Sequence, residues 1–214
     1  MSSGTMNRRD LLKGMGLGVV VIALPGWEGF AVAQEEAGGR PATAAGDGPE
    51  IKINNNYARG QWFFDPAGLY VPKGQKVRWL GTKWGATVTA FHPSNYNHEL
   101  RIPEGAKPFD SGLIGEDSNR YNSFEWTFDV EGTYDYFSRN HEVLGMVGRI
   151  VVGSPGGPAE KNPPGYGGRE GRAPVFPAQA KMLEALPSAQ IVAKKIIPYP
   201  RDVVVRSFPY GDAR

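Results

Sequence analysis

Short β-type runs dominate the sequence between residues 51 and 152, and they constrain the fold more than any other feature. Turn signals such as Asp65-Pro66 and Glu131-Gly132 separate the runs, and no sustained helical period is present. Several short strands with Gly- and Pro-rich punctuation are typical of a β-sandwich or β-barrel. The predicted strands are Ile51–Asn54, Gln61–Phe64, Leu69–Val71, Lys76–Leu80, Thr87–Phe91, Ser123–Phe128, Thr133–Phe137 and Gly148–Val152.

Alternation within these runs predicts which side chains face the core. In the run from Lys76 to Leu80, Val77 and Trp79 share one face, while Lys76 and Arg78 share the other. In the run from Thr133 to Phe137, two tyrosines lie on the face opposite Asp135 and Phe137. The aromatic residues predicted to face the core are Phe124, Trp126, Phe128, Tyr134 and Tyr136.

The 214-residue chain contains no cysteine, which excludes disulfides, thiolate metal sites and cysteine nucleophiles. No dense Lys/Arg run with interleaved aromatics is present, so nucleic-acid binding is not expected. The sequence also lacks a Gly-x-Ser-x-Gly elbow, a phosphate-cradling loop and a His-Glu-x-x-His pair. Carboxylates at Asp110, Glu116 and Asp117 fit a solvated loop better than catalysis. We therefore predict that the protein is not an enzyme.

The N-terminus has the features of an export signal. Residues 7–13, which include Arg8 and Arg9, resemble the twin-arginine targeting motif, and a weakly apolar stretch follows. Ala31-Val32-Ala33 provides a small-x-small site for cleavage before Gln34. The alternative is a retained membrane anchor over residues 14–33, since about 20 residues are just sufficient to span a bilayer. We predict a signal or anchor over residues 1–33, a flexible leader over 34–50, and a periplasmic or other extracytoplasmic location.

Residues 154–214 differ in composition from the preceding domain. The last 60 residues hold 10 of the 18 prolines and 9 Lys and Arg against 5 Asp and Glu, whereas residues 34–154 hold 12 against 15. Proline and glycine predict an extended linker over 154–177, followed by short helices over 178–186 and 189–195, with Ser188 as the N-cap of the second. This C-terminal arm either orders against a partner, such as an acidic protein surface or anionic lipid, or packs on its own sandwich.

Three segments resemble plastocyanin-like cupredoxins, the family of blue copper proteins. Residues 132–153, GTYDYFSRNHEVLGMVGRIVVG, resemble its C-terminal half, in which a strand, a ligand loop and a final strand follow one another. Residues 63–80 and 86–114 resemble upstream parts of the same family. The resemblance covers residues 51–153 and implies an all-β, Greek-key β-sandwich over that range.

The resemblance also implies where copper ligands would lie. In the family, a histidine from an early strand and a Cys-x-x-His-x-x-x-x-Met loop hold the metal. Ser138, His141 and Met146 occupy the three loop positions, and Ala86 occupies the position of the first histidine. A hydroxyl cannot replace a soft thiolate and alanine offers no lone pair, so two of the four positions are lost. Asn140 is a further departure, because the family often has proline before the histidine. We predict no bound cofactor.

A different metal site is the alternative to this prediction. The only other histidines are His92 and His98, and a site that uses His98, Glu99, His141 or Glu142 is conceivable, although the spacing matches no recurrent pattern. The rival function is accordingly that of a periplasmic metal-binding or electron-transfer protein with an atypical copper site.

The leading functional hypothesis combines the retained sandwich, the lost ligands and the basic C-terminal arm. Because cupredoxins dock on membrane redox complexes, the resemblance implies a partner in a respiratory complex or photosynthetic reaction centre. We predict a non-catalytic, copper-free docking subunit of such a complex, held by its C-terminal arm and by possible contact with the membrane surface.

Overall fold

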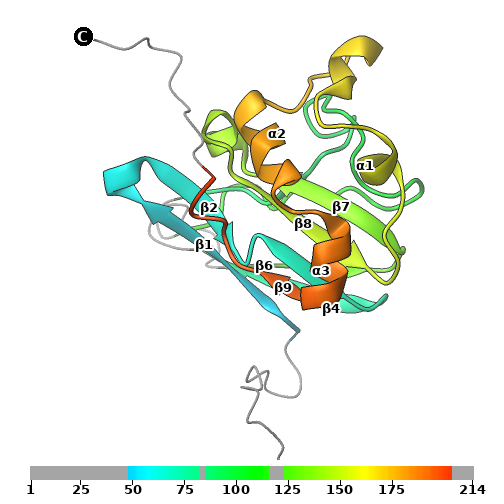
Figure 1. Cartoon of the computed structure of the whole chain (residues 1–214), viewed down its shortest axis with the longest axis horizontal. Helices are drawn as coiled ribbons and strands as arrows, with labels where there is room; N and C mark the ends of the chain where they lie inside the picture. Colours follow the sequence, from blue (N-terminus) through cyan, green and yellow to red (C-terminus); the bar gives the residue numbers. More distant parts are fainter. Residues whose placement is uncertain (1–47, 82–84, 116–122, 204–214) are drawn as a thin grey trace, which may run out of the picture. The chain divides into compact units, whose positions relative to one another are not determined.

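Two β-sheets face each other in the computed structural model, which describes residues 48–81, 85–115 and 123–203 (Figure 1). Within these ranges, one sheet has the order β2 (Gln61–Asp65), β1 (Glu50–Asn56), β4 (Gln75–Leu80) and β6 (Ser123–Phe128). The other has the order β5 (Thr89–Ala90), β7 (Gly132–Phe137), β8 (Val147–Val152), β3 (Gly68–Val71) and β9 (Ile196–Ile197). The predicted β-sandwich is therefore confirmed.

Strand pairing mixes parallel and antiparallel neighbours. Strands β1 and β4 pair in parallel, with Ile51 opposite Trp79, and β3 pairs in parallel with β8. Hairpin-type antiparallel pairs join β1 to β2 and β7 to β8. Parallel pairs need long connections that cross between the sheets, so the order along the chain differs from the order within each sheet.

The core between the sheets follows the alternation in the sequence. Val77 and Trp79 are fully buried, and the Trp79 ring lies against the rings of Phe128 and Tyr136. Phe124 and Trp126 are only partly buried and pack at the border of this core. The predicted strand over 87–91 is shorter than expected, because regular pairing is restricted to Thr89 and Ala90.

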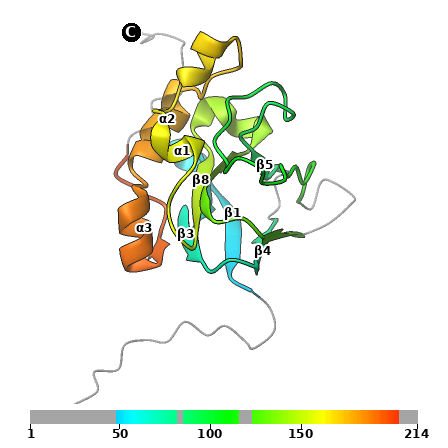
Figure 2. The ribbon, with the colours of Figure 1, turned by 90° about the vertical axis from the view of Figure 1, so that its right-hand side faces the viewer.

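Both faces of β7 and β8 are buried, which alternation did not predict. Every residue of the two strands is buried, including Asp135 and Phe137 on the face opposite Tyr134 and Tyr136. The inner face contacts the other sheet. The outer face is covered by the C-terminal segment, as Figures 1 and 2 show.

The C-terminal segment packs on its own sandwich through residue 203. It forms α1 (Pro158–Lys161), the 3-10 helix η4 (Tyr166–Glu170), α2 (Pro177–Glu184), α3 (Ser188–Lys194) and β9. Met182 and Leu183 join a cluster with Phe137 and Val147, and Leu186 and Ile191 join another with Val151. The expectation of an extended linker over 154–177 is wrong, because the segment forms α1 and η4, and hydrogen bonds to Glu99 and Arg101 hold it in place.

Ser188 also differs from expectation, since it is not an N-cap. Pro187 precedes the first turn of α3, and the Ser188 hydroxyl instead donates a hydrogen bond to Glu160 Oε1 at 2.5 Å. Thr133 Oγ1 donates to the same carboxylate oxygen at 2.7 Å. Glu160 thus connects α1, α3 and β7 on the covered face of the sheet.

A buried charge network joins the sandwich to the C-terminal segment. Arg149 and Arg101 both bind the Asp135 carboxylate, at 2.7 Å and 2.8 Å, and Arg101 also contacts Glu99 at 3.2 Å. Arg101 donates to the carbonyl oxygen of Ala159, and Arg149 donates to that of Leu186. Burial favours the neutral form of Asp135, but the two guanidinium groups outweigh it and lower its pKa.

The predicted signal or anchor (residues 1–33), most of the leader, Glu116 and Asp117 lie outside the described residues. In the part of the chain that the structure describes, no helix is long and apolar enough to cross a membrane.

Candidate functional site

The loop between β7 and β8 brings three of the four inherited ligand positions together. It runs from Ser138 through the 3-10 helix η3 (Arg139–Leu144) to Gly145, whose φ of 75° suits glycine, and then to Met146. The Ser138 N–H donates to the Met146 carbonyl at 3.1 Å, and the Met146 N–H donates to the His141 carbonyl at 3.3 Å. These bonds close the loop so that Ser138, His141 and Met146 converge.

Ser138 is fully buried, and its hydroxyl already has partners. Its Oγ accepts a hydrogen bond from the Thr87 N–H at 3.2 Å and lies 3.2 Å from His141 Nδ1. Ala86 directly precedes Thr87, is itself fully buried, and pairs through its backbone with Ile114. The fourth position therefore lies beside the loop, but it presents only a methyl group.

A chain of hydroxyl groups extends from the loop beneath the surface. Thr87 Oγ1 accepts from the Arg139 N–H at 2.9 Å and lies 2.9 Å from Thr89 Oγ1. Thr89 Oγ1 in turn donates to Asp110 Oδ1 at 3.0 Å. These hydrogen bonds fix the loop to β5.

His141 lies against an aromatic ring at the surface end of the loop. Its imidazole stacks on the Trp62 indole, with 5.2 Å between ring centroids and 13° between planes. Tyr57 contacts the same indole edge-on at 5.3 Å. Burial disfavours the imidazolium and lowers the pKa of His141 to about 4, so the ring is neutral at pH 7.

Comparison with known proteins shows what this domain is similar to. Residues 51–153 match the profile of copper-binding proteins of the plastocyanin/azurin family. Those residues form a cupredoxin-like β-sandwich. Pseudoazurin of Methylorubrum extorquens is 28% identical over 110 residues, which are 51% of this chain and 65% of the relative. Halocyanin of Natronomonas pharaonis is 31% identical, over 46% of this chain and 50% of the relative.

The chain is also similar to a plastocyanin and to a solved pseudoazurin structure. Plastocyanin of Scenedesmus fuscus is 27% identical over 48% of this chain and 99% of its own length. The crystal structure of pseudoazurin from Methylobacterium extorquens aligns with a TM-score of 0.43 at 24% identity, covering 54% of this chain and 81% of that one. The chain thus spans between half and two thirds of the pseudoazurin and halocyanin sequences, and the whole of plastocyanin.

The residues of this cupredoxin-like domain do not fit a blue copper ion. A hydroxyl and a methyl group occupy two ligand positions, and the hydroxyl is already hydrogen-bonded. Met146 is fully buried within the apolar cluster between the sheets. Only the His141 imidazole and the Met146 thioether remain of the ligand set, too few to form a site of that type.

The alternative metal site that the sequence left open is not assembled either. His98 Nε2 lies 3.5 Å from Glu142 Oε1, but Glu99 turns away to accept hydrogen bonds from the Gly165 and Gly167 N–H groups. His92 bonds to Ser94 instead. Over residues 48–81, 85–115 and 123–203, no three His, Asp or Glu side chains gather around a possible metal position.

The Ser138–His141 contact resembles the pair of a serine hydrolase but lacks its requirements. The Ser138 hydroxyl is inaccessible to a substrate, and a base with a pKa of about 4 is too weak to activate it at neutral pH. The pair therefore has a structural role. Sequence reasoning found the inherited ligand positions but missed the Thr87–Thr89–Asp110 chain and the Trp62 stack, because these partners are distant in sequence.

Proposed function

We propose that the protein is a copper-free docking subunit that binds the extracytoplasmic side of a membrane electron-transfer complex without carrying electrons itself. One observation carries the proposal: the loop keeps its backbone closure, while a hydrogen-bonded hydroxyl at Ser138 and a methyl group at Ala86 stand at two of the four ligand positions. The retained loop then serves to present a surface.

The proposed docking surface, termed the loop surface, consists of Tyr57, Trp62, His141 and Val143. Tyr57 and Val143 are exposed by 55% and 52%, which is high for apolar side chains. The Tyr57–Trp62–His141 stack holds the surface rigid, so little side-chain entropy is lost when a partner covers it. His141 adds no charge at pH 7 and leaves this surface apolar.

We assign docking to the loop surface rather than to the C-terminal arm. Met182, Leu183, Leu186 and Ile191 of the arm are already buried against the sandwich, and this leaves Phe176 and Ile196 as its exposed large apolar side chains among the described residues. The twin-arginine-like signal supports an extracytoplasmic location, because signals of this type direct export from the cytoplasm. Whether residues 1–33 are cleaved or retained as an anchor does not alter the proposal.

Co-purification tests the docking proposal directly. A tagged full-length chain, extracted from its native membranes in mild detergent, is expected to migrate in a large complex whose other subunits mass spectrometry identifies. The Val143→Glu variant should be released as a free monomer. Ile196→Glu, which alters a similarly exposed apolar residue on β9, should remain in the complex. A wild-type protein that is recovered only as a monomer would refute the proposal.

Metal titration separates this function from its rival. Calorimetry of the purified protein with Cu(II) and Zn(II) should show no stoichiometric sub-micromolar binding. Tight one-to-one binding that is lost in His141→Gln would instead establish an atypical metal protein.

A further inference from the structure

A polar pocket of about 460 Å³ lies between the tip of the β1–β2 hairpin and the segment that follows β9. The hairpin reaches the pocket through the 3-10 helix η1 (Tyr57–Arg59), which ends at Gly60 with a φ of 61°. The other wall comes from Tyr199 and Arg201, more than 130 residues later in the chain. The return of the C-terminal segment across the sandwich therefore creates this pocket.

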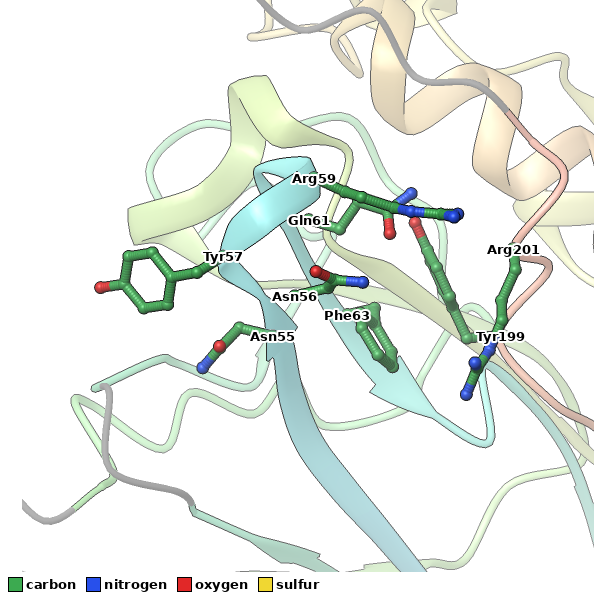
Figure 3. A pocket seen from close by; sticks show the side chains of 8 residues that line it. All are labelled: Asn55, Asn56, Tyr57, Arg59, Gln61, Phe63, Tyr199 and Arg201. Carbon is green, nitrogen blue, oxygen red and sulfur yellow. The ribbon is translucent and has the colours of Figure 1, made fainter.

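Two arginines face the pocket. The side chains of Arg59 and Arg201 approach it from opposite walls, with Tyr199 between them (Figure 3). Among residues 48–81, 85–115 and 123–203, neither guanidinium forms an ion pair, and no acidic side chain lines the pocket. Two cations close to one opening repel each other unless an anion lies between them.

The remaining lining supplies hydrogen-bond donors above an aromatic base. The carboxamides of Asn56 and Gln61 lie beside Arg59 at the pocket (Figure 3). Phe63 and Tyr199 stack with 4.1 Å between ring centroids and 18° between planes. The Tyr199 N–H donates to Asp65 Oδ1 at 3.2 Å, which holds the backbone at Tyr199 against β2. Burial raises the pKa of Tyr199, so its hydroxyl remains a neutral donor.

We propose that this pocket binds a phosphate group of a small organic phosphate or of an anionic lipid headgroup. A guanidinium forms paired hydrogen bonds with phosphate oxygens, and two guanidiniums with several amide donors match the many acceptors of a phosphate. A volume of about 460 Å³ is within the usual range for small-ligand pockets and accommodates more than the phosphate alone. The inference is independent of the docking role proposed for the loop surface.

Binding measurements on the full-length chain test the proposal. Glycerol 3-phosphate is the soluble probe, measured by calorimetry, and vesicles of phosphatidylglycerol in phosphatidylcholine are the membrane probe, measured by sedimentation. The pocket variant is Arg59→Gln with Arg201→Gln. The matched control is Lys73→Gln with Lys107→Gln, which removes the same charge from two exposed positions outside the pocket. All four positions are exposed, so unchanged thermal unfolding should verify that both variants fold.

Two results support the site and distinguish its ligand. Saturable glycerol 3-phosphate binding, weakened at least tenfold in the pocket variant and unchanged in the control, identifies a free organic phosphate. Vesicle binding that decreases at least tenfold in the pocket variant alone, without binding of the soluble probe, identifies a lipid headgroup. If neither probe binds, or if both variants lose binding equally, the pocket is not a phosphate site.

Discussion

At the residue scale, Ser138 stands at the position of the copper-binding cysteine, but its hydroxyl has a structural role. A thiolate would need a metal ion or a cation to stabilise its charge, whereas a hydroxyl is satisfied by the Thr87 N–H and His141 Nδ1. Removing one partner of a buried hydrogen bond typically costs about 1–3 kcal/mol. Ser138 therefore contributes to loop stability, and its replacement alone should not restore copper chemistry.

Restoring both lost ligands should create a copper site. In the Ala86→His, Ser138→Cys double variant, the preserved loop places the new thiolate beside His141 and Met146. We expect one-to-one Cu(II) binding with an intense visible absorption band, measured by titration in a spectrophotometer. Ser138→Cys alone, which lacks the fourth ligand, should bind at least tenfold more weakly. A colourless double variant would show that the loop no longer permits the ligand geometry.

His141 makes a prediction about pH. Its pKa falls from 6.5 to about 4 on folding, so the unfolded chain takes up a proton between these values and the folded chain does not. Stability from this residue is therefore complete above pH 6.5 and decreases as the pH falls towards 4. The loss should be about 1–2 kcal/mol, because solvent screens the partly exposed ring.

The comparison with His141→Gln isolates this effect from other acid-labile groups. Urea unfolding at several pH values should show wild-type stability decreasing more steeply than that of the variant between pH 6.5 and 4. Parallel curves for the two proteins would mean that His141 titrates normally in the folded state.

At the scale of the elements, β7 and β8 are central strands rather than half-exposed ones. Asp135 and Arg149 lie directly opposite each other in the β7–β8 register, on the face covered by α2 and α3. Charged residues in the middle of apolar strands are expensive to bury unless paired. Here the pairing is made across strands and reinforced by Arg101.

Breaking this network should destabilise the domain strongly. Asp135→Asn leaves the buried guanidiniums of Arg101 and Arg149 without their shared counter-charge. Loss of one partner of a buried ion pair typically costs about 3–5 kcal/mol. The free energy of unfolding in urea measures this cost. Lys76→Gln, which breaks an exposed ion pair with Glu125, is the control and should cost less than about 1 kcal/mol. Similar losses in both variants would contradict the central role of Asp135.

The contrast between predicted and observed elements has a physical basis. Val77 and Trp79 could be placed correctly because alternation reports burial on one face of a sheet. The same rule misplaced Asp135 and Phe137, since part of their cover comes from the C-terminal segment, more than 20 positions later in the chain. The inherited site at Ser138 was visible from loop spacing, whereas its hydroxyl chain through Thr87 required the fold. The sequence did contain one signal that the outer face of β8 is covered, namely the charged residue Arg149 within an apolar run.

At the scale of the whole molecule, the C-terminal segment is a third layer of the fold. Removing residues 155–214 would expose the apolar outer face of β7 and β8, including Phe137, Val147 and Val151, and would unpair β9 from β3. A large apolar face without cover favours aggregation. The chain truncated after Ser154 should therefore be insoluble or unfold at a much lower temperature than the full chain.

A break in the backbone tests the same layer without removing it. Ser154 and Pro155 are both exposed, so a protease site inserted between them should be cut in the folded protein. We expect the C-terminal segment to remain bound after cleavage, because the Arg101 and Arg149 contacts and the clusters around Leu183 and Ile191 do not depend on the cut bond. Size-exclusion chromatography and native mass spectrometry should give an unchanged mass, with separation only in denaturant. Spontaneous release of the segment into buffer would show that it is a peripheral arm after all, free to engage a partner.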